Sequence, residues 1–301
     1  MKVLISGGSG LVGGALTRAL RADGHSACHL VRPGGKAAPG DVQWNPLSAL
    51  ADLPAMEGFD AVVNLNGASI GDRRWTPKRK TILRGSRVDS TRVLVDALSQ
   101  LRQPPRVFVC ASATGCYGNR GDELLTETSG YGSDFLATLC RAWEGEATRA
   151  ASSGIRTVIA RFGIVLSAEG GALSHMLTPF RFGVGGRLGS GKQWMSWIAL
   201  GDAVNVLRAA MDDARWNGAV NLVSPEPVRN SQFTRVLASV LHRPAIFPAP
   251  GLALRLGLGE MADALLLSSQ RVLPEGLQQY GFAFRYENLE AALHAALTKK
   301  S

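Results

Sequence analysis

A glycine triplet near the amino terminus constrains the fold of this 301-residue chain more than any other feature. Gly7, Gly10 and Gly13 follow a short apolar run at residues 3–5 and open an amphipathic stretch at residues 11–22. A second apolar run occupies residues 28–31, so the region is predicted to fold as strand, turn, helix and strand. Glycines at these positions permit a sharp turn, a close approach of phosphate to the backbone, and tight packing of the helix on the strand. We therefore predict a dinucleotide at the start of this helix. The predicted contacts are Gly7, Ser9, Gly10, Leu11, Val12 and Gly13.

The alternation of strands and helices continues through the first half of the chain. Apolar runs at residues 60–64, 106–111 and 155–160 predict strands, and helices are predicted between them at residues 77–101 and 134–152. Continuously apolar strands that alternate with helices form parallel sheets covered on both faces. We therefore expect an α/β fold with a Rossmann-type, doubly wound parallel sheet.

The pattern changes after Arg161. Residues 163–191 are glycine-rich around one expected helix at 172–181. Further helices are expected at 202–212, 231–241, 252–267 and 289–297, and a strand at 219–223. We predict a dinucleotide-binding domain over residues 1–165, to which residues 200–224 return. A smaller C-terminal α/β substrate domain is predicted over residues 166–301.

The end of the second predicted strand indicates which dinucleotide is bound. A site that prefers NAD places an Asp or Glu near this point to accept a hydrogen bond from the ribose 2′-hydroxyl. This chain has Arg32 there, with Lys36 close behind. Since a guanidinium favours a 2′-phosphate, we expect NADP (NADPH) as the cofactor and Arg32 as its reader.

The formal net charge of +9 suggests an anionic ligand, a nucleic acid or a membrane surface. No nucleic-acid-reading module and no strongly basic amphipathic helix is found, so neither nucleic acid nor membrane is expected as a partner. The four cysteines and five histidines lack metal-ligand spacing, so no metal site is predicted and the thiols are expected to be reduced. No signal peptide or apolar run of ~18 residues is found. We expect a cytoplasmic monomer or homodimer with an unknown small-molecule substrate.

Several stretches together resemble the extended short-chain dehydrogenases/reductases, the NAD-dependent epimerase/dehydratase-like group. The similarity is closer to one atypical branch of this group, the epimerase family. Its members have their own C-terminal domain and are regarded as NADP-dependent oxidoreductases. The similar stretches are Gly7–Gly13, Asn64–Gly67, Arg73–Trp75, Gly85–Arg87, Ser90–Thr91, Asp134–Leu136, Trp143–Glu144, Arg161–Leu166, Gly189–Gly191, Trp197–Ile198 and Asp202. From Pro244 onward the chain resembles the C-terminal domain of that branch.

The resemblance implies where the cofactor and the substrate lie. Cofactor contacts are implied for Leu65, Asn66, Gly67, Arg73, Ala111, Ser112 and Ile164. The superfamily catalyses with Ser and a Tyr-x-x-x-Lys dyad. Ser112 fills the Ser position, whereas alignment on Glu144 places Leu136 and Cys140 at the Tyr and Lys positions. Tyr117 is a candidate general acid in place of the missing dyad if a nearby cation lowers the pKa of its phenol, but a Tyr-Gly turn that packs beside the sheet is the favoured interpretation.

Three functions follow from these observations. The first is an NADP-dependent oxidoreductase that acts on a small carbonyl or alcohol, with Ser112 binding the carbonyl. The second is a nucleotide-sugar epimerase or dehydratase, against which the missing dyad argues. The third is a protein that binds NADP(H) as a redox sensor and no longer catalyses.

Overall fold

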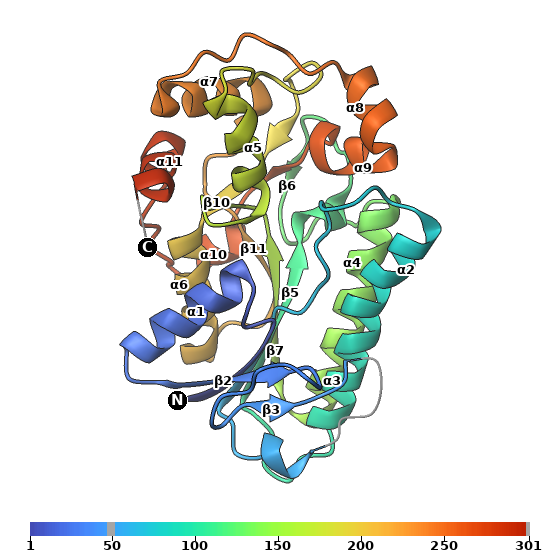
Figure 1. The fold of residues 1–301 in the computed structure, drawn as a ribbon. Coiled ribbons are helices and arrows are strands. Elements are labelled where there is room, and N and C mark those ends of the chain that lie inside the picture. The colour runs from blue at the N-terminus through green and yellow to red at the C-terminus, as the bar shows by residue number, and fades with distance from the viewer. Residues whose placement is uncertain (47–51, 299–301) are drawn as a thin grey trace.

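A seven-stranded parallel sheet forms the centre of the computed structural model, which describes residues 1–46 and 52–298 (Figure 1). Its strand order is β11-β7-β5-β4-β1-β2-β3, and every pair of neighbours is parallel. The strands are β1 (Lys2–Ser6), β2 (Ser26–Val31), β3 (Val42–Gln43), β4 (Ala61–Asn64), β5 (Val107–Ala113), β7 (Arg156–Phe162) and β11 (Gly218–Leu222). This order confirms the predicted doubly wound, Rossmann-type sheet.

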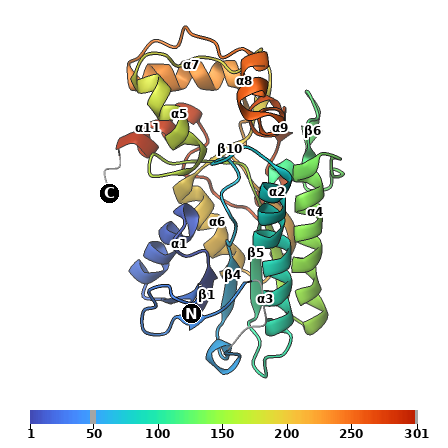
Figure 2. The ribbon, with the colours of Figure 1, turned by 45° about the vertical axis from the view of Figure 1, so that its right-hand side comes forward.

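Helices cover both faces of the sheet (Figure 2). On one face α1 (Leu11–Ala22) and α6 (Leu200–Asp212) pack on alternate strand residues such as Ile5 and Val109. On the other face α3 (Ser90–Leu98) and α4 (Phe135–Thr148) pack on the residues between them, such as Leu4 and Phe108. Because successive strand residues point to opposite faces, a strand buried on both sides must be apolar throughout.

The helix predicted at residues 77–101 is one rod with an irregular centre. It consists of α2 (Pro77–Arg84), a π-helical turn η2 (Gly85–Asp89) and α3, which ends at Leu98. The side chain of Thr76 caps its start by accepting a hydrogen bond from Arg79 N (3.1 Å). π turns inside helices are frequent at functional sites, because they re-aim the side chains that they carry.

A second lobe lies above the carboxyl ends of the strands (Figure 1). Its core is formed by α5 (Gly171–Arg181), α7 (Asn230–Leu241) and α11 (Leu289–Thr298), packed on β8 (Ile164–Leu166) and β10 (Trp197–Ala199). Between them the chain returns to the central sheet as α6 and β11. The domain limits proposed from the sequence remain a prediction.

The segment after residue 250 connects the two lobes. Here α8 (Gly251–Leu258), α9 (Glu260–Ala262) and the π turn η5 (Asp263–Leu267) replace the single helix predicted at 252–267. Lys80 of α2 pairs with Glu260 of α9 (2.5 Å), and Met261 joins the core around α3 and α4. The remaining elements are η1 (Pro54–Met56), η3 (Thr114–Tyr117), β6 (Leu124–Leu125), η4 (Arg149–Ser153), β9 (Trp194–Met195), β12 (Val228–Arg229), β13 (Arg271–Val272) and α10 (Glu275–Gln279). None of the helices within the described ranges has the length and apolar character needed to span a bilayer.

Candidate functional site

The loop between β1 and α1 is shaped by its three glycines. Gly7 has φ of +73°, and a Cβ there would lie 2.6 Å from the carbonyl oxygen of Leu65. A Cβ on Gly13 would lie 2.3 Å from the carbonyl oxygen of Gly7, which no real contact allows. At Gly10 only the Gly7 carbonyl is near, at 3.2 Å. Gly7 and Gly13 therefore allow close backbone packing, while Gly10 leaves space above the loop.

The start of α1 is free to hold an anion. Gly10 is its N-cap, and no side chain caps the helix or places an acid in its first turn. The Gly10 N–H donates to Gly7 O (3.0 Å), whereas the amides of the first helical residues have no acceptor within the helix. The helix dipole adds a partial positive charge at the same point. Uncapped amides beside an open glycine are a suitable cradle for the phosphates of a dinucleotide.

Arg32 follows the last residue of β2, at the same edge of the sheet as the glycine loop. It is exposed, and the described part of the chain offers its guanidinium no carboxylate partner. Arg73 is also exposed and lies in the loop that precedes α2. Both guanidinium groups are thus accessible to a ligand, and their roles as cofactor contacts remain predictions.

The loop after β4 packs on the π turn η2. Asn66 Nδ2 donates to Ser86 O (3.2 Å), and Ala68 N donates to Ser86 Oγ (3.0 Å). A Cβ on Gly67 would lie 3.1 Å from the guanidinium carbon of Arg87, so any larger residue would require this side chain to shift. Leu65 N continues the sheet by donating to Ser6 O (3.0 Å).

Arg87 is a functional candidate that the sequence analysis did not single out. Its guanidinium lies beneath Gly67 and over the ring of Trp143, 5.5 Å from the centroid. Burial lowers the pKa of this guanidinium, and among residues 1–46 and 52–298 no carboxylate pairs with it. A half-buried cation without an anion, next to a predicted cofactor loop, indicates an anionic or hydroxyl-rich ligand.

A buried polar network joins the ends of β5 and β7 to α4. The Ser112 hydroxyl donates to Glu144 Oε1 (2.5 Å), and Arg161 contacts both oxygens of Glu144, through Nε (3.0 Å) and Nη2 (2.8 Å). Both partners of this ion pair have 5% exposed side chains. Glu144 Oε2 also accepts from the Tyr131 hydroxyl (2.6 Å). Each oxygen of the buried carboxylate therefore accepts two hydrogen bonds.

Tyr117 belongs to the buried side of this network. Its hydroxyl donates to Asn221 Oδ1 (2.7 Å) and accepts from Arg161 Nη1 (3.0 Å), and its side chain is fully buried. Burial raises the pKa of its phenol. Tyr117 therefore packs beside the sheet, as the interpretation favoured from the sequence has it, and the alternative of an acid presented to the cleft is corrected. Ser112 is 3% exposed, and its proton is held by Glu144.

The two positions that the alignment on Glu144 assigns to the Tyr and Lys of the dyad carry buried side chains in the fold. Leu136 and Cys140 lie one turn apart on α4, and both are buried. Burial raises the pKa of the Cys140 thiol to about 12, so this sulfur is neither a nucleophile nor a cation. Ala111 lies in β5 beside Ser112, and Ile164 opens β8. The structure therefore places Ala111 and Ser112 at the carboxyl end of β5, and Ile164 just after the neighbouring strand β7.

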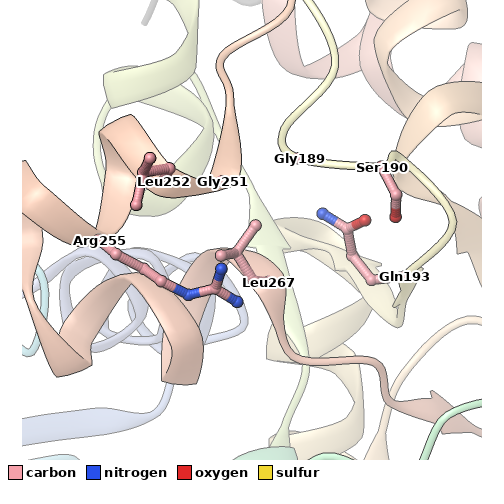
Figure 3. A pocket seen from close by; sticks show the side chains of 7 residues that line it. All are labelled: Gly189, Ser190, Gln193, Gly251, Leu252, Arg255 and Leu267. Carbon is pink, nitrogen blue, oxygen red and sulfur yellow. The ribbon is translucent and has the colours of Figure 1, made fainter.

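A pocket of about 370 Å³ lies in the upper lobe, between the glycine-rich segment and α8 (Figure 3). Gly189, Ser190 and Gln193 of the glycine-rich segment form one side, and Leu252 and Arg255 of α8 form the other. Gln193 is fixed by donating to Leu188 O (3.1 Å) and Leu266 O (2.9 Å). The glycine-rich segment thus borders a cavity of the upper lobe whose lining includes neither Ser112 nor Tyr117.

Comparison with known proteins agrees with this geometry. The sequence model of the NAD dependent epimerase/dehydratase family matches residues 3–222, and a domain of unknown function (DUF1731) matches residues 249–296. The chain belongs to the NAD dependent epimerase/dehydratase family.

Curated relatives and solved structures cover almost the whole chain. An epimerase family protein of Mycobacterium tuberculosis is 42% identical over 99% of this chain and 98% of its own length. A chloroplastic homologue of SDR39U1 from Arabidopsis thaliana is 38% identical over 99% of this chain and 87% of its own. The crystal structure of human epimerase family protein SDR39U1 (isoform 2) with NADPH has a TM-score of 0.91 and 33% identity, covering 99% of this chain and 100% of that one.

Proposed function

We propose that this protein is an NADP(H)-dependent oxidoreductase that acts on a small carbonyl or alcohol. The observation that carries the proposal is the uncapped start of α1 beside Gly10, with Arg32 at the end of the neighbouring strand. A dinucleotide needs the first feature, and its 2′-phosphate needs the second. The NADPH in the structure of the human relative supports the same cofactor.

Each part of the site has a role in this proposal. The amides of Leu11, Val12 and Gly13 hold the pyrophosphate, and Arg32 binds the 2′-phosphate. Arg87 donates to the cofactor across Gly67. When bound, NADPH supplies a hydride to the substrate carbonyl.

Ser112 contacts the substrate oxygen in this proposal. To donate to that oxygen, its hydroxyl must turn away from Glu144 Oε1, to which it donates in this structure. Arg161 keeps Glu144 in place through two hydrogen bonds, so the carboxylate remains neutralised when Ser112 turns.

A titration of four cofactors tests the binding part of the proposal. NADPH, NADP, NADH and NAD are titrated against the wild type, Arg32→Ala and Arg106→Ala, with nicotinamide fluorescence or calorimetry as the readout. Loss of a charge-assisted hydrogen bond of about 1.5–3 kcal/mol predicts that Arg32→Ala binds NADPH about 10- to 100-fold more weakly. Arg106 precedes β5 and thus lies at the amino ends of the strands, opposite the glycine loop and Arg32. Its removal should therefore leave the affinity for NADPH unchanged. Equal affinity of the wild type for NADH and NADPH would contradict the NADP assignment.

A second candidate function is a non-catalytic NADP(H) sensor. It is favoured by the network that occupies the Ser112 hydroxyl and by apolar side chains at the dyad positions. A screen of small carbonyls with NADPH, followed at the nicotinamide absorbance, separates the two functions. Turnover that Ser112→Ala abolishes supports the oxidoreductase, whereas tight NADPH binding without turnover of any substrate supports the sensor.

A further inference from the structure

Large apolar side chains protrude from the outer end of the upper lobe. Eight large hydrophobic side chains are exposed in the described chain, and six of them lie on this end. These six form what we call the cap patch: Phe182, Val184, Ile246, Phe247, Leu252 and Leu256. Phe182 is 79% exposed, and Leu256 is 72% exposed. Single exposed apolar residues are common, but a group of six marks an interaction surface.

The cap patch is continuous because its segments run side by side. Phe247 N donates to Gly185 O (3.3 Å), and Ala249 N donates to Arg187 O (2.9 Å). A Cβ on Gly186 would lie 1.9 Å from Phe247 O, so the two segments touch through their backbones. The chain then enters α8, in which no residue is buried. Figure 1 shows α8 and the connection from α7 together at the top of the molecule.

The two segments that form the cap patch carry only positive charge. No Asp or Glu occurs in residues 170–201 or in residues 227–259. The same residues contain seven cations: Arg181, Arg187, Lys192, Arg229, Arg235, Arg243 and Arg255. Arg229 and Arg255 form ion pairs with Asp122 and Asp263. Arg181 and Arg243, which flank the apolar side chains, are exposed and form no ion pair with any described residue.

We propose that the cap patch docks this protein on an anionic lipid bilayer. Protruding Phe, Ile and Leu side chains insert at the boundary of headgroups and acyl chains, while the surrounding arginines face anionic headgroups. A second copy of the chain is a poor occupant, because two such faces would bring like charges together. The side chains project outward from loop tips and from α8, which suits a deformable bilayer better than a preformed protein groove.

From the sequence we expect no membrane partner, because no strongly basic amphipathic helix is found. The cap patch is not one helix. It is assembled from the end of α5, the connection after α7, and the outer face of α8. This proposal concerns a surface separate from the cofactor site and does not depend on the oxidoreductase function.

Vesicle co-sedimentation of the full chain tests the proposal. The vesicles contain phosphatidylcholine alone, or phosphatidylcholine with about 30% phosphatidylglycerol. Binding is measured at about 0.1 M salt, where exposed charges are only partly screened. We expect binding only to the anionic vesicles. Arg181→Gln/Arg243→Gln should bind about 25-fold more weakly, at about fivefold for each cation near the surface. Phe182→Ser/Ile246→Ser should also bind more weakly. Thermal unfolding midpoints check that each variant is folded.

The matched control removes the same charge from the lower lobe. Arg102→Gln/Arg106→Gln should bind within about twofold of the wild type, because both exposed arginines lie between α3 and β5, at the amino ends of the strands and thus at the end of the molecule opposite the upper lobe. An equal loss in the control and the Arg181/Arg243 variant would overturn the proposal, since net charge alone would then explain binding. Failure of the wild type to bind anionic vesicles would also overturn it. Capture by a poly-glutamate peptide without vesicle binding would assign the patch to an acidic protein instead.

Discussion

The buried ion pair between Glu144 and Arg161 makes a strong prediction about stability. The substitution Glu144→Gln keeps the shape of the side chain but removes the charge opposite Arg161. Removing one partner of a buried pair typically costs about 3–5 kcal/mol, because the remaining charge stays desolvated. The same change disturbs the acceptor of Ser112 and Tyr131, which now donate at 2.5 and 2.6 Å. We therefore expect Glu144→Gln to lower the free energy of unfolding by about 3–5 kcal/mol.

The size of the temperature shift follows from the length of the chain. An unfolding entropy of about 2.1 cal/mol/K per residue over 301 residues gives about 0.6 kcal/mol/K. A loss of about 3–5 kcal/mol then lowers the Tm by about 5–8 °C. Far-ultraviolet circular dichroism, recorded without cofactor, measures this shift independently of any activity.

A matched control lies two residues further along α4. Glu146 pairs with Arg92 (2.7 Å) and Arg149 (2.8 Å), but both arginines are about half exposed. Exposed pairs contribute about 0–1 kcal/mol each, so Glu146→Gln should lower the Tm by less than about 3 °C. If Glu144→Gln unfolded at the same temperature as Glu146→Gln, the reasoning about burial would be refuted. A double variant with Arg161→Gln should lose less than the sum of the single losses.

Three further predictions concern other parts of the molecule. Gly186→Ala should destabilise the fold by more than about 1 kcal/mol, because its Cβ would lie 1.9 Å from Phe247 O. Gly257→Ala is the control and should be neutral or stabilising, because a Cβ there meets nothing within 4 Å. Urea unfolding compares the stabilities of the two variants. Hydrogen bonds from the Arg215 side chain and backbone lower the pKa of Asp213 to about 2, so its contribution should be present above the unfolded pKa of about 3.8 and be lost as pH falls through about 2. A titration followed by NMR checks this value, and Asp213→Asn should show no such acid-dependent loss. The four cysteines are buried, so a thiol reagent at pH 8 should label them only as fast as the chain unfolds, and rapid labelling of native protein would contradict this burial.

The sheet and the glycine loop could be predicted because their signals are local. Gly7, Gly10 and Gly13 stand between a strand and a helix, and each constraint acts within a few residues. The alternation of apolar strands and amphipathic helices then leaves few topologies for a parallel sheet. The π turn at 85–89 was not predicted, because a helix pattern with one glycine does not show how its centre is wound.

The candidate site could be predicted only in part, since its contacts are tertiary. Ser112 is at the expected strand end, yet the sequence does not show that Glu144, from the following helix, binds its hydroxyl. Arg87 is one of seven cations in a 15-residue stretch, and only the fold separates it from the exposed Arg73. The sequence signal for the position of Arg87 was Gly67, because a glycine in a loop can mark the close approach of another group. The sequence does not show that this group is the side chain of a residue twenty positions further along the chain.

The position of β11 at one end of the sheet has a consequence for biosynthesis. This strand pairs with β7, but residues 163–217, which include parts of the upper lobe and α6, are made between them. A chain emerging from the ribosome therefore holds six strands with the edge of β7 unpaired until residue 222 is available. An unpaired edge invites pairing with other chains. Chaperone protection during synthesis is expected to matter most in this interval, and truncated chains that end before residue 218 should aggregate.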